Sequence, residues 1–191
     1  MKQYLDLVRH ILDHGTTKTD PQGVGNIAVG GYQMRFNLED GFPLVTTRDL
    51  SGSWRAMVYE LLWFLSGSIH VADLNKDGVH LWDLWATPEI CKNLGLEAGD
   101  LGPIYGKQWR AFSCGDGVEV DQIQVLVNDL KRNPDSRRNI VSSWNPSDIN
   151  KVFVAPCHCF YQLFHANGKL TLMLYQRSAD VPVGVPFNIA E

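Results

Sequence analysis

Cys157 is the residue of this sequence with the clearest capacity for chemistry. It follows Pro156 at the start of an apolar, alternating segment, and Arg177 comes twenty residues later. The thiolate is the reactive form of cysteine, and positive charge from an arginine or from His158 favours that form. A lone cysteine is more often a small buried residue of the core. The local sequence therefore indicates a candidate nucleophile, with a buried thiol as the alternative.

Glu60 is the second candidate because it is a carboxylate inside an apolar segment. Its neighbours Val58 and Leu61-Leu62-Trp63 make burial without a partner unfavourable. One interpretation is that Glu60 pairs with an arginine or lies at the edge of a helix. The other is that it transfers a proton in apolar surroundings, where desolvation favours the neutral form of a carboxyl group.

Three further groups could recognise a nucleotide. Arg137-Arg138 directly follows Pro134-Asp135-Ser136, and Arg177-Ser178 follows an apolar segment. Guanidinium groups beside a hydroxyl match the oxygens of a phosphate, although adjacent arginines at a turn are often simply solvated. The amide of Asn188 can form two hydrogen bonds with the amide edge of a pyrimidine, or it can cap a turn.

These residues need a scaffold of both helices and strands. Apolar spacing predicts helices at 4–12 and 54–65, the second buried on all sides, and an amphipathic helix at 121–132 with Asp121 as N-cap. Apolar runs predict strands, and Asn167-Gly168 between two of them predicts a tight hairpin. The predicted strands are 27–29, 32–38, 140–144, 153–165 and 170–175, and residues 66–109 are expected to form loops and short helices.

The helices and strands do not alternate regularly, which favours an α+β fold over a doubly wound sheet. A length of 191 residues fits a single domain, and the net charge of −4 argues against a requirement for nucleic acid. The first residues lack the apolar core of a signal peptide, and no run approaches the length of a membrane span.

Four cysteines without framework spacing favour reduced thiols and a cytoplasmic location. Cys157-His158-Cys159 is too closely spaced for the usual zinc ligands, so no metal is expected.

Eight segments of the chain, in one order, resemble thymidylate synthase. They include Gly102-Pro103-Ile104-Tyr105-Gly106-Lys107-Gln108-Trp109-Arg110, Pro134-Asp135-Ser136-Arg137-Arg138 and Ala155-Pro156-Cys157-His158. The resemblance extends from near the start of the chain to its end, which argues against chance or convergence. The eight segments are 33–38, 41–47, 60–65, 99–110, 134–138, 155–158, 176–181 and 186–190.

The resemblance implies a thymidylate synthase-like α+β fold, in which a mixed β-sheet forms the homodimer interface and helices pack on the other face. It implies reductive methylation of dUMP to dTMP, with 5,10-methylenetetrahydrofolate as donor of carbon and hydride. Cys157 would attack C6 of the uracil ring, which makes C5 nucleophilic, and would leave once the methyl group is complete.

The resemblance also assigns roles to single positions. The catalytic set would be Cys157, Glu60 as a proton relay near uracil O4, Tyr105 in a proton-transfer network, His158 and Asp180. The substrate dUMP would be bound by Gln176, Arg177, Ser178 and Asn188, with Arg137 and Arg138 reaching its phosphate from the partner subunit. The folate would contact Asp180, Leu81, Gly184, Phe187 and Trp82, the last as an aromatic wall beside the reacting methylene.

Two features depart from the family pattern. Pro21 stands where the family has a phosphate-binding arginine, and a lost charge-assisted contact is worth about 1.5–3 kcal/mol. We therefore expect weaker dUMP binding than in relatives with that arginine. The sequence ends at Glu191, where the family continues with a long helix and further segments for ribose and folate. We therefore expect little or no activity from the 191-residue chain alone.

Two other functions stay open at this point. A pyrimidine-nucleotide hydroxymethylase of the same superfamily would add water instead of hydride, although Trp82 and Asn188 favour methylation of dUMP. A non-catalytic nucleotide-binding remnant would bind dUMP or dimerise without turnover.

Overall fold

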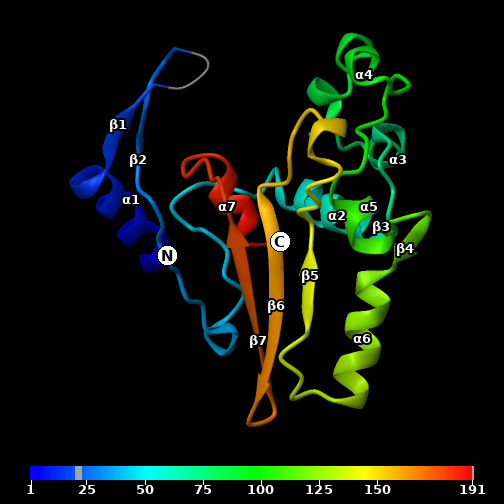
Figure 1. The fold of residues 1–191 in the computed structure, drawn as a ribbon. Helices are drawn as coiled ribbons and strands as arrows, with labels where there is room; N and C mark the ends of the chain where they lie inside the picture. Colours follow the sequence, from blue (N-terminus) through cyan, green and yellow to red (C-terminus); the bar gives the residue numbers. More distant parts are fainter. Residues whose placement is uncertain (20–22, 191) are drawn as a thin grey trace. The chain divides into compact units, whose positions relative to one another are not determined.

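The protein is described by a computed structural model that covers residues 1–19 and 23–190 (Figure 1). Contacts divide the chain into two compact units, each described here by itself. The first unit combines Met1–Trp54 with Asp180–Glu191, and the second is Arg55–Ala179. The single domain expected from chain length stays a prediction.

The first unit begins with α1 (Lys2–His14), which ends where the Gly15 amide donates to the Ile11 carbonyl. Two short strands, β1 (Thr16–Lys18) and β2 (Asn26–Ala28), form an antiparallel pair after it. A 3-10 turn, η1, follows at Leu38–Asp40, and α7 lies near the end of the chain at Gly184–Asn188. The predicted helix at 4–12 is therefore confirmed.

The strand predicted at 32–38 is wrong. Residues 32–37 are irregular and pair with no strand in the described part of the chain. An unpaired strand leaves its backbone groups to water, so apolar composition alone does not make one. Instead, the Asn37 side chain accepts a hydrogen bond from the Glu39 amide and begins η1.

Two side chains tie the last segment of the chain to the first inside this unit. The Tyr4 hydroxyl donates to the Val181 carbonyl at 3.2 Å, and Arg48 Nη1 donates to the Pro182 carbonyl at 2.9 Å. Because both acceptors are backbone atoms, these bonds fix the course of the chain directly after Asp180.

The second unit holds most of the helices. Its α6 begins as predicted, because the Asp121 side chain accepts a hydrogen bond from the Gln124 amide at 2.9 Å. Its α4 begins at Thr87, whose side chain accepts from the Ile90 amide. The helices and 3-10 turns of this part are α2 (Trp54–Ser66), α3 (Val71–Asn75), η2 (Asp83–Trp85), α4 (Pro88–Leu94), α5 (Tyr105–Arg110), α6 (Gln122–Arg132) and η3 (Ile149–Lys151).

Two antiparallel sheets complete the second unit. The larger sheet has the order β5-β6-β7, from β5 (Ile140–Ser142), β6 (His158–Ala166) and β7 (Lys169–Gln176). The predicted hairpin is confirmed, since Asn167 and Gly168 both have positive φ in the turn between β6 and β7. The smaller sheet is the hairpin of β3 (Phe112–Gly115) and β4 (Val118–Val120).

Three strand predictions need correction. The sheet is antiparallel throughout the described residues rather than mixed, because the tight turn after β6 can only return the chain antiparallel. Strand β6 begins at His158 rather than at 153, since Pro156 has no amide to donate. Strand β5 ends at Ser142 rather than at 144, because the Ser143 and Trp144 amides both donate to the Cys159 carbonyl.

The core of the second unit lies between helices and one face of this sheet. Val141 on β5, with Tyr161 and Leu163 on β6, packs against aromatic residues of α2 and α5 and against Leu126 of α6. Helices therefore cover one face, as predicted, and the α+β class is confirmed. The helix α2 is not buried all round: Trp63 and Phe64 are buried, whereas Val58 and Leu62 are exposed.

The opposite face of the sheet is apolar and exposed. Phe160 stacks on Tyr175 with ring centroids 5.5 Å apart, and Phe164, Met173 and Tyr175 are all exposed. Exposed apolar faces of this kind often mark protein contacts. The expected use of the sheet as a homodimer interface stays a prediction.

Candidate active site

Cys157 lies at the junction between a loop and β6, and its backbone is held from two sides. Its amide donates to the Tyr105 hydroxyl oxygen at 2.7 Å, and its carbonyl accepts from the Arg177 amide at 2.9 Å. The side chain is partly buried, and its thiol is free. The thiol is therefore not fully buried, and its role as a nucleophile stays a prediction.

Arg177 places a positive charge beside this thiol. Its Nε donates to the Pro156 carbonyl at 2.9 Å, and its Nη2 donates to the Ala155 carbonyl at 2.7 Å. The same Nη2 lies 3.9 Å from Cys157 Sγ. Arg177 is therefore a cation in contact with the sulfur of the candidate nucleophile.

Tyr105, on α5, is buried directly behind the nucleophile. Its oxygen accepts a second hydrogen bond from the His158 amide at 3.4 Å, and its ring packs on the His158 ring at 5.6 Å. Burial, followed by the nearby Cys157 and Glu60, raises the pKa of Tyr105 above its usual range. The phenol is therefore neutral at physiological pH and keeps a proton.

Glu60 lies on α2 and is half-buried, and its recorded partner is an indole rather than an arginine. Trp82 Nε1 donates to Glu60 Oε1 at 2.5 Å. The Trp82 ring in turn packs against Phe64 and Tyr105. This aromatic cluster connects the carboxylate to the region behind Cys157, while the neighbouring Leu81 is exposed.

The end of β7 supplies the remaining expected substrate ligands of the second unit. Gln176 pairs across the sheet with His158, the residue that follows the nucleophile. Arg177 and Ser178 come directly after the strand and are exposed. The hairpin register therefore brings 176–178 beside Cys157, although twenty residues separate Arg177 from it in sequence.

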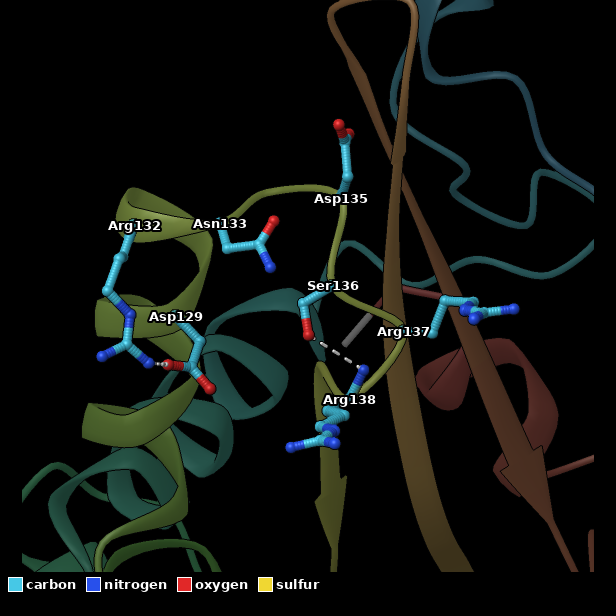
Figure 2. A pocket seen from close by; sticks show the side chains of 7 residues that line it. All are labelled: Asp129, Arg132, Asn133, Asp135, Ser136, Arg137 and Arg138. Atoms are coloured by element: carbon cyan, nitrogen blue, oxygen red, sulfur yellow. Dashed lines mark hydrogen bonds and ion pairs between the residues drawn. The ribbon is translucent and has the colours of Figure 1, made fainter.

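Arg137 and Arg138 line a hollow of about 420 Å³ after α6 (Figure 2). The acids of this hollow have partners, because Asp129 pairs with Arg132 at 2.7 Å and Asp135 pairs with His165 at 3.1 Å. Within the described residues, neither Arg137 nor Arg138 pairs with a carboxylate. Figure 2 shows their side chains leaving the loop in different directions.

The loop that carries Arg137 and Arg138, the arginine loop, lies far along β6 from Cys157. Gln162 Nε2 donates to the Arg137 carbonyl at 3.2 Å, which fixes that residue beside the middle of the strand. Gln162 comes five positions after Cys157, or roughly 16 Å along an extended chain at about 3.3 Å per residue. The structure therefore places Arg177 and this loop at separate positions along β6.

Four expected site residues belong to the first unit. The Asp180 carboxylate accepts from the Val183 amide at 2.8 Å, and its carbonyl accepts from the Gly184 amide at 2.9 Å. A Cβ atom at Gly184 would lie 3.6 Å from Asn188 Oδ1. Asp180, Gly184 and Asn188 therefore form one group around α7, with Phe187 partly buried in the same helix. Pro21 lies outside the described residues.

The sequence of the chain was compared with models of known protein families. The model described as thymidylate synthase matches residues 2–191. The chain belongs to the thymidylate synthase family. Thymidylate synthases use 5,10-methylenetetrahydrofolate, and the family places this chain among the transferases of nucleotide biosynthesis.

The described residues hold neither a metal-ligand cluster nor a helix that could span a membrane. No group of three or more His, Cys, Asp or Glu side chains gathers there as ligands for a metal ion. None of the helices described is long and apolar enough to cross a membrane.

Three side chains around Cys157 and the arginine loop were not among the residues predicted from the sequence. Trp144 lies under the Arg177 guanidinium, and Gln162 and His165 hold the arginine loop. Gln162 and His165 interrupt the largely apolar sequence of β6. This interruption could have indicated that the two residues have specific partners. Nothing in the sequence around Trp144 distinguishes it from a core tryptophan.

Proposed function

We propose that this chain catalyses the reductive methylation of dUMP to dTMP with 5,10-methylenetetrahydrofolate, and that Cys157 is the nucleophile. The observation that carries the proposal is the setting of Cys157. A guanidinium nitrogen lies 3.9 Å from its sulfur, and a buried phenol holds its amide at 2.7 Å. Membership of the thymidylate synthase family supplies the reaction class.

The proposed role of Cys157 is covalent. The thiolate attacks C6 of the uracil ring, a bond forms between Sγ and C6, and the C5–C6 π electrons move toward C5 and O4. C5 thereby becomes a carbon nucleophile. C5 takes up the one-carbon unit and gives up its proton. When hydride completes the methyl group, the C5–C6 double bond returns as the Sγ–C6 bond breaks, so the enzyme thiolate is regenerated.

Glu60 and Tyr105 are proposed to manage protons around the ring. Negative charge develops near O4, and the half-buried Glu60, whose Oε1 accepts a hydrogen bond from Trp82, is proposed to relay a proton there. The Tyr105 phenol keeps its proton, because burial raises its pKa. The His158 ring contacts the Tyr105 ring at a tilt and completes the proposed network.

Recognition of dUMP is proposed to divide between two copies of the chain. Gln176, Arg177 and Ser178 would bind from the copy that supplies Cys157. Arg137 and Arg138 would bind phosphate from the partner, because within one copy their loop lies roughly 16 Å along β6 from the nucleophile. Asn188 would read the uracil amide edge through its own amide, which selects uracil over cytosine.

The residues expected to hold the folate fit such a ligand chemically. Asp180 offers an exposed carboxylate for ring N–H groups, and Gly184 leaves open the space that a side chain would fill beside Asn188. Trp82, Leu81 and Phe187 would supply apolar surface. When bound, the folate supplies the one-carbon unit and the hydride.

The test is a trapping experiment with fluorodeoxyuridine monophosphate and 5,10-methylenetetrahydrofolate. Fluorine at C5 cannot leave as a proton does, so the reaction should stop at a covalent adduct on Cys157. Intact-mass and peptide spectra should locate the adduct there. The Cys157→Ala variant should give none, and Cys159→Ala, which changes the buried thiol two residues away, should still give it.

Each outcome decides between the functions that were considered. An adduct on Cys157 supports an enzyme, and folded protein that binds dUMP without forming the adduct would identify a nucleotide-binding remnant. Products from unmodified dUMP separate the two enzymes. We expect dTMP with dihydrofolate, whereas hydroxymethyl-dUMP with tetrahydrofolate would identify a hydroxymethylase and overturn the proposal.

A further inference from the structure

The ring of Trp144 supports the guanidinium that faces the nucleophile. Arg177 Cζ lies 5.4 Å from the centroid of the Trp144 ring. At such a separation the face of an indole attracts a cation, and tryptophan does so more strongly than phenylalanine. The contact brings together two residues that lie 33 positions apart in the sequence.

The backbone of Trp144 is itself fixed beside the nucleophile. Its amide and that of Ser143 both donate to the Cys159 carbonyl, at 3.1 and 2.8 Å. The Ser142 hydroxyl donates to the Trp144 carbonyl at 3.1 Å. The indole therefore starts from a backbone anchored to β6 two residues after Cys157, and the ring is partly buried.

The other contacts of Arg177 do not by themselves fix the orientation of its guanidinium plane. The two carbonyls of Ala155 and Pro156 hold Nη2 and Nε, which lie on one edge of the guanidinium. Two hydrogen bonds along an edge allow the plane to rock about that edge. A flat ring against the face of the guanidinium opposes this motion, and the motion would turn the other N–H bond of Nη2 relative to Cys157 Sγ.

We propose that Trp144 is a positioning residue, whose indole face fixes the plane of the Arg177 guanidinium and so holds the positive charge beside the Cys157 thiol. The proposal rests on the function proposed above, because it assigns Trp144 to the reaction of Cys157. It adds to that function a residue that does not touch the substrate.

The test measures the reactivity of the thiol without dUMP or folate. Alkylation of Cys157 by iodoacetamide is followed by peptide mass spectrometry from about pH 6 to about pH 9, where thiols of ordinary and lowered pKa separate. Trp144→Leu removes the ring face, and Trp144→Phe keeps an aromatic face. Exposed Cys114 in the same digest is the internal reference.

We expect Trp144→Leu to slow alkylation of Cys157 near pH 7 by about two- to fivefold, as follows from the loss of a cation–π contact at an exposed site. The pH midpoint of the reaction should move upward. Trp144→Phe should keep most of the wild-type alkylation rate and pH midpoint of Cys157. The alkylation of Cys114 should not change in either variant. Tyr105 and Cys159 also interact electrostatically with the Cys157 thiol. The hydrogen bonds of Tyr105 and Cys159 should therefore be the same in the Leu and Phe variants.

Three results would overturn the proposal. The first is an unchanged profile in Trp144→Leu. The second is an equal loss in the Phe and Leu variants, because Phe keeps a ring face. The third result matters if Trp144→Leu does not fold. Cys157 should then be alkylated at the same rate in Arg177→Lys and in the double variant Arg177→Lys with Trp144→Phe. A slower rate in the double variant would contradict the proposed route through Arg177. A failed trapping experiment with normal alkylation behaviour would count against the proposed function alone.

Discussion

Tyr105 performs two tasks with one oxygen atom. It accepts hydrogen bonds from two successive backbone amides, those of Cys157 and His158, and it keeps its own proton because burial raises its pKa. The first task places the nucleophile at the start of β6. The second leaves a neutral O–H group beside the proposed reaction centre.

Replacing Tyr105 by phenylalanine should affect stability and chemistry together. The buried amides of Cys157 and His158 would lose their acceptor, and an unsatisfied buried polar group costs about 1–3 kcal/mol. We expect the free energy of unfolding in urea to fall by about that amount. Formation of the fluorodeoxyuridylate adduct should slow as well.

Tyr161→Phe is the matched control for this substitution. Tyr161 lies on β6 with its ring edge-on to Trp109, and burial raises its pKa to about 12. The Phe variant keeps the ring contact and leaves the amides of Cys157 and His158 bonded. An equal loss of adduct formation in both variants would contradict a specific role for the Tyr105 oxygen.

At the scale of elements, α6 is tied to α5 by the charge at its N-terminus. Asp121 caps α6 and also receives the Arg110 guanidinium, with Nη2 to Oδ2 at 2.8 Å. Burial acts to raise the pKa of Asp121, but hydrogen bonds from Arg110 and from the Gln124 amide, with the arginine charge, outweigh it. The pKa therefore lies below its usual value of 3.8.

This lowered pKa predicts a loss of stability in acid. A folded-state pKa below the unfolded value stabilises the protein above pH 3.8, and the stabilisation disappears as pH falls through the folded value. Urea unfolding at about pH 5, 4 and 3 should show little change above pH 3.8 and a fall below it. Asp121→Asn, which still caps a helix, should have a shallower dependence in this range.

The exposed Asp116→Asn, on the turn between β3 and β4, provides the comparison. That variant should keep the dependence of the wild type. If Asp121→Asn retains the full acid dependence, the stabilisation comes from other carboxylates, such as Asp148 beside Lys151.

At the scale of the whole molecule, β6 separates two groups that are proposed to bind the same nucleotide. Cys157 and Arg177 lie at one end of β6, and the arginine loop is held at Gln162 and His165 farther along. The exposed apolar face with Phe164, Met173 and Tyr175 is the surface on which a second copy could pack. Two copies would bring each arginine loop to the other copy's nucleophile.

Mixed dimers test this arrangement directly. Cys157→Ala and the double variant Arg137→Ala with Arg138→Ala should each form little adduct alone. Co-expressed in equal amounts, they should form about a quarter of the wild-type adduct, because half of the random dimers contain one complete site.

Cys157→Ala with Glu60→Ala is the matched pair for this experiment. Both residues lie in the second unit of one copy and are proposed to serve the same site, so mixing should restore nothing. Recovery in this pair, or none in the first pair, would contradict a site shared between subunits.

The prediction from sequence was most successful where the signal is local. The start of α6 at Asp121 and the turn at Asn167-Gly168 depend on a few adjacent residues, and both were predicted correctly. The strand expected at 32–38 failed, because a strand depends on a partner that local sequence does not reveal. The prediction that α2 is buried on all sides failed for the same reason, because burial depends on what packs against a helix. Val58 and Leu62 are exposed.

The sequence by itself determined the family and the chemical types of the site: a thiol, a carboxylate, a phenol and several guanidinium groups, in one order. Only the tertiary structure decided their pairings. The register of the β6–β7 hairpin places Arg177 beside Cys157, α5 brings Tyr105 behind it, and Trp144 arrives from the end of β5. These pairings join residues far apart in the chain, and long-range contacts are set by packing and strand register rather than by local spacing.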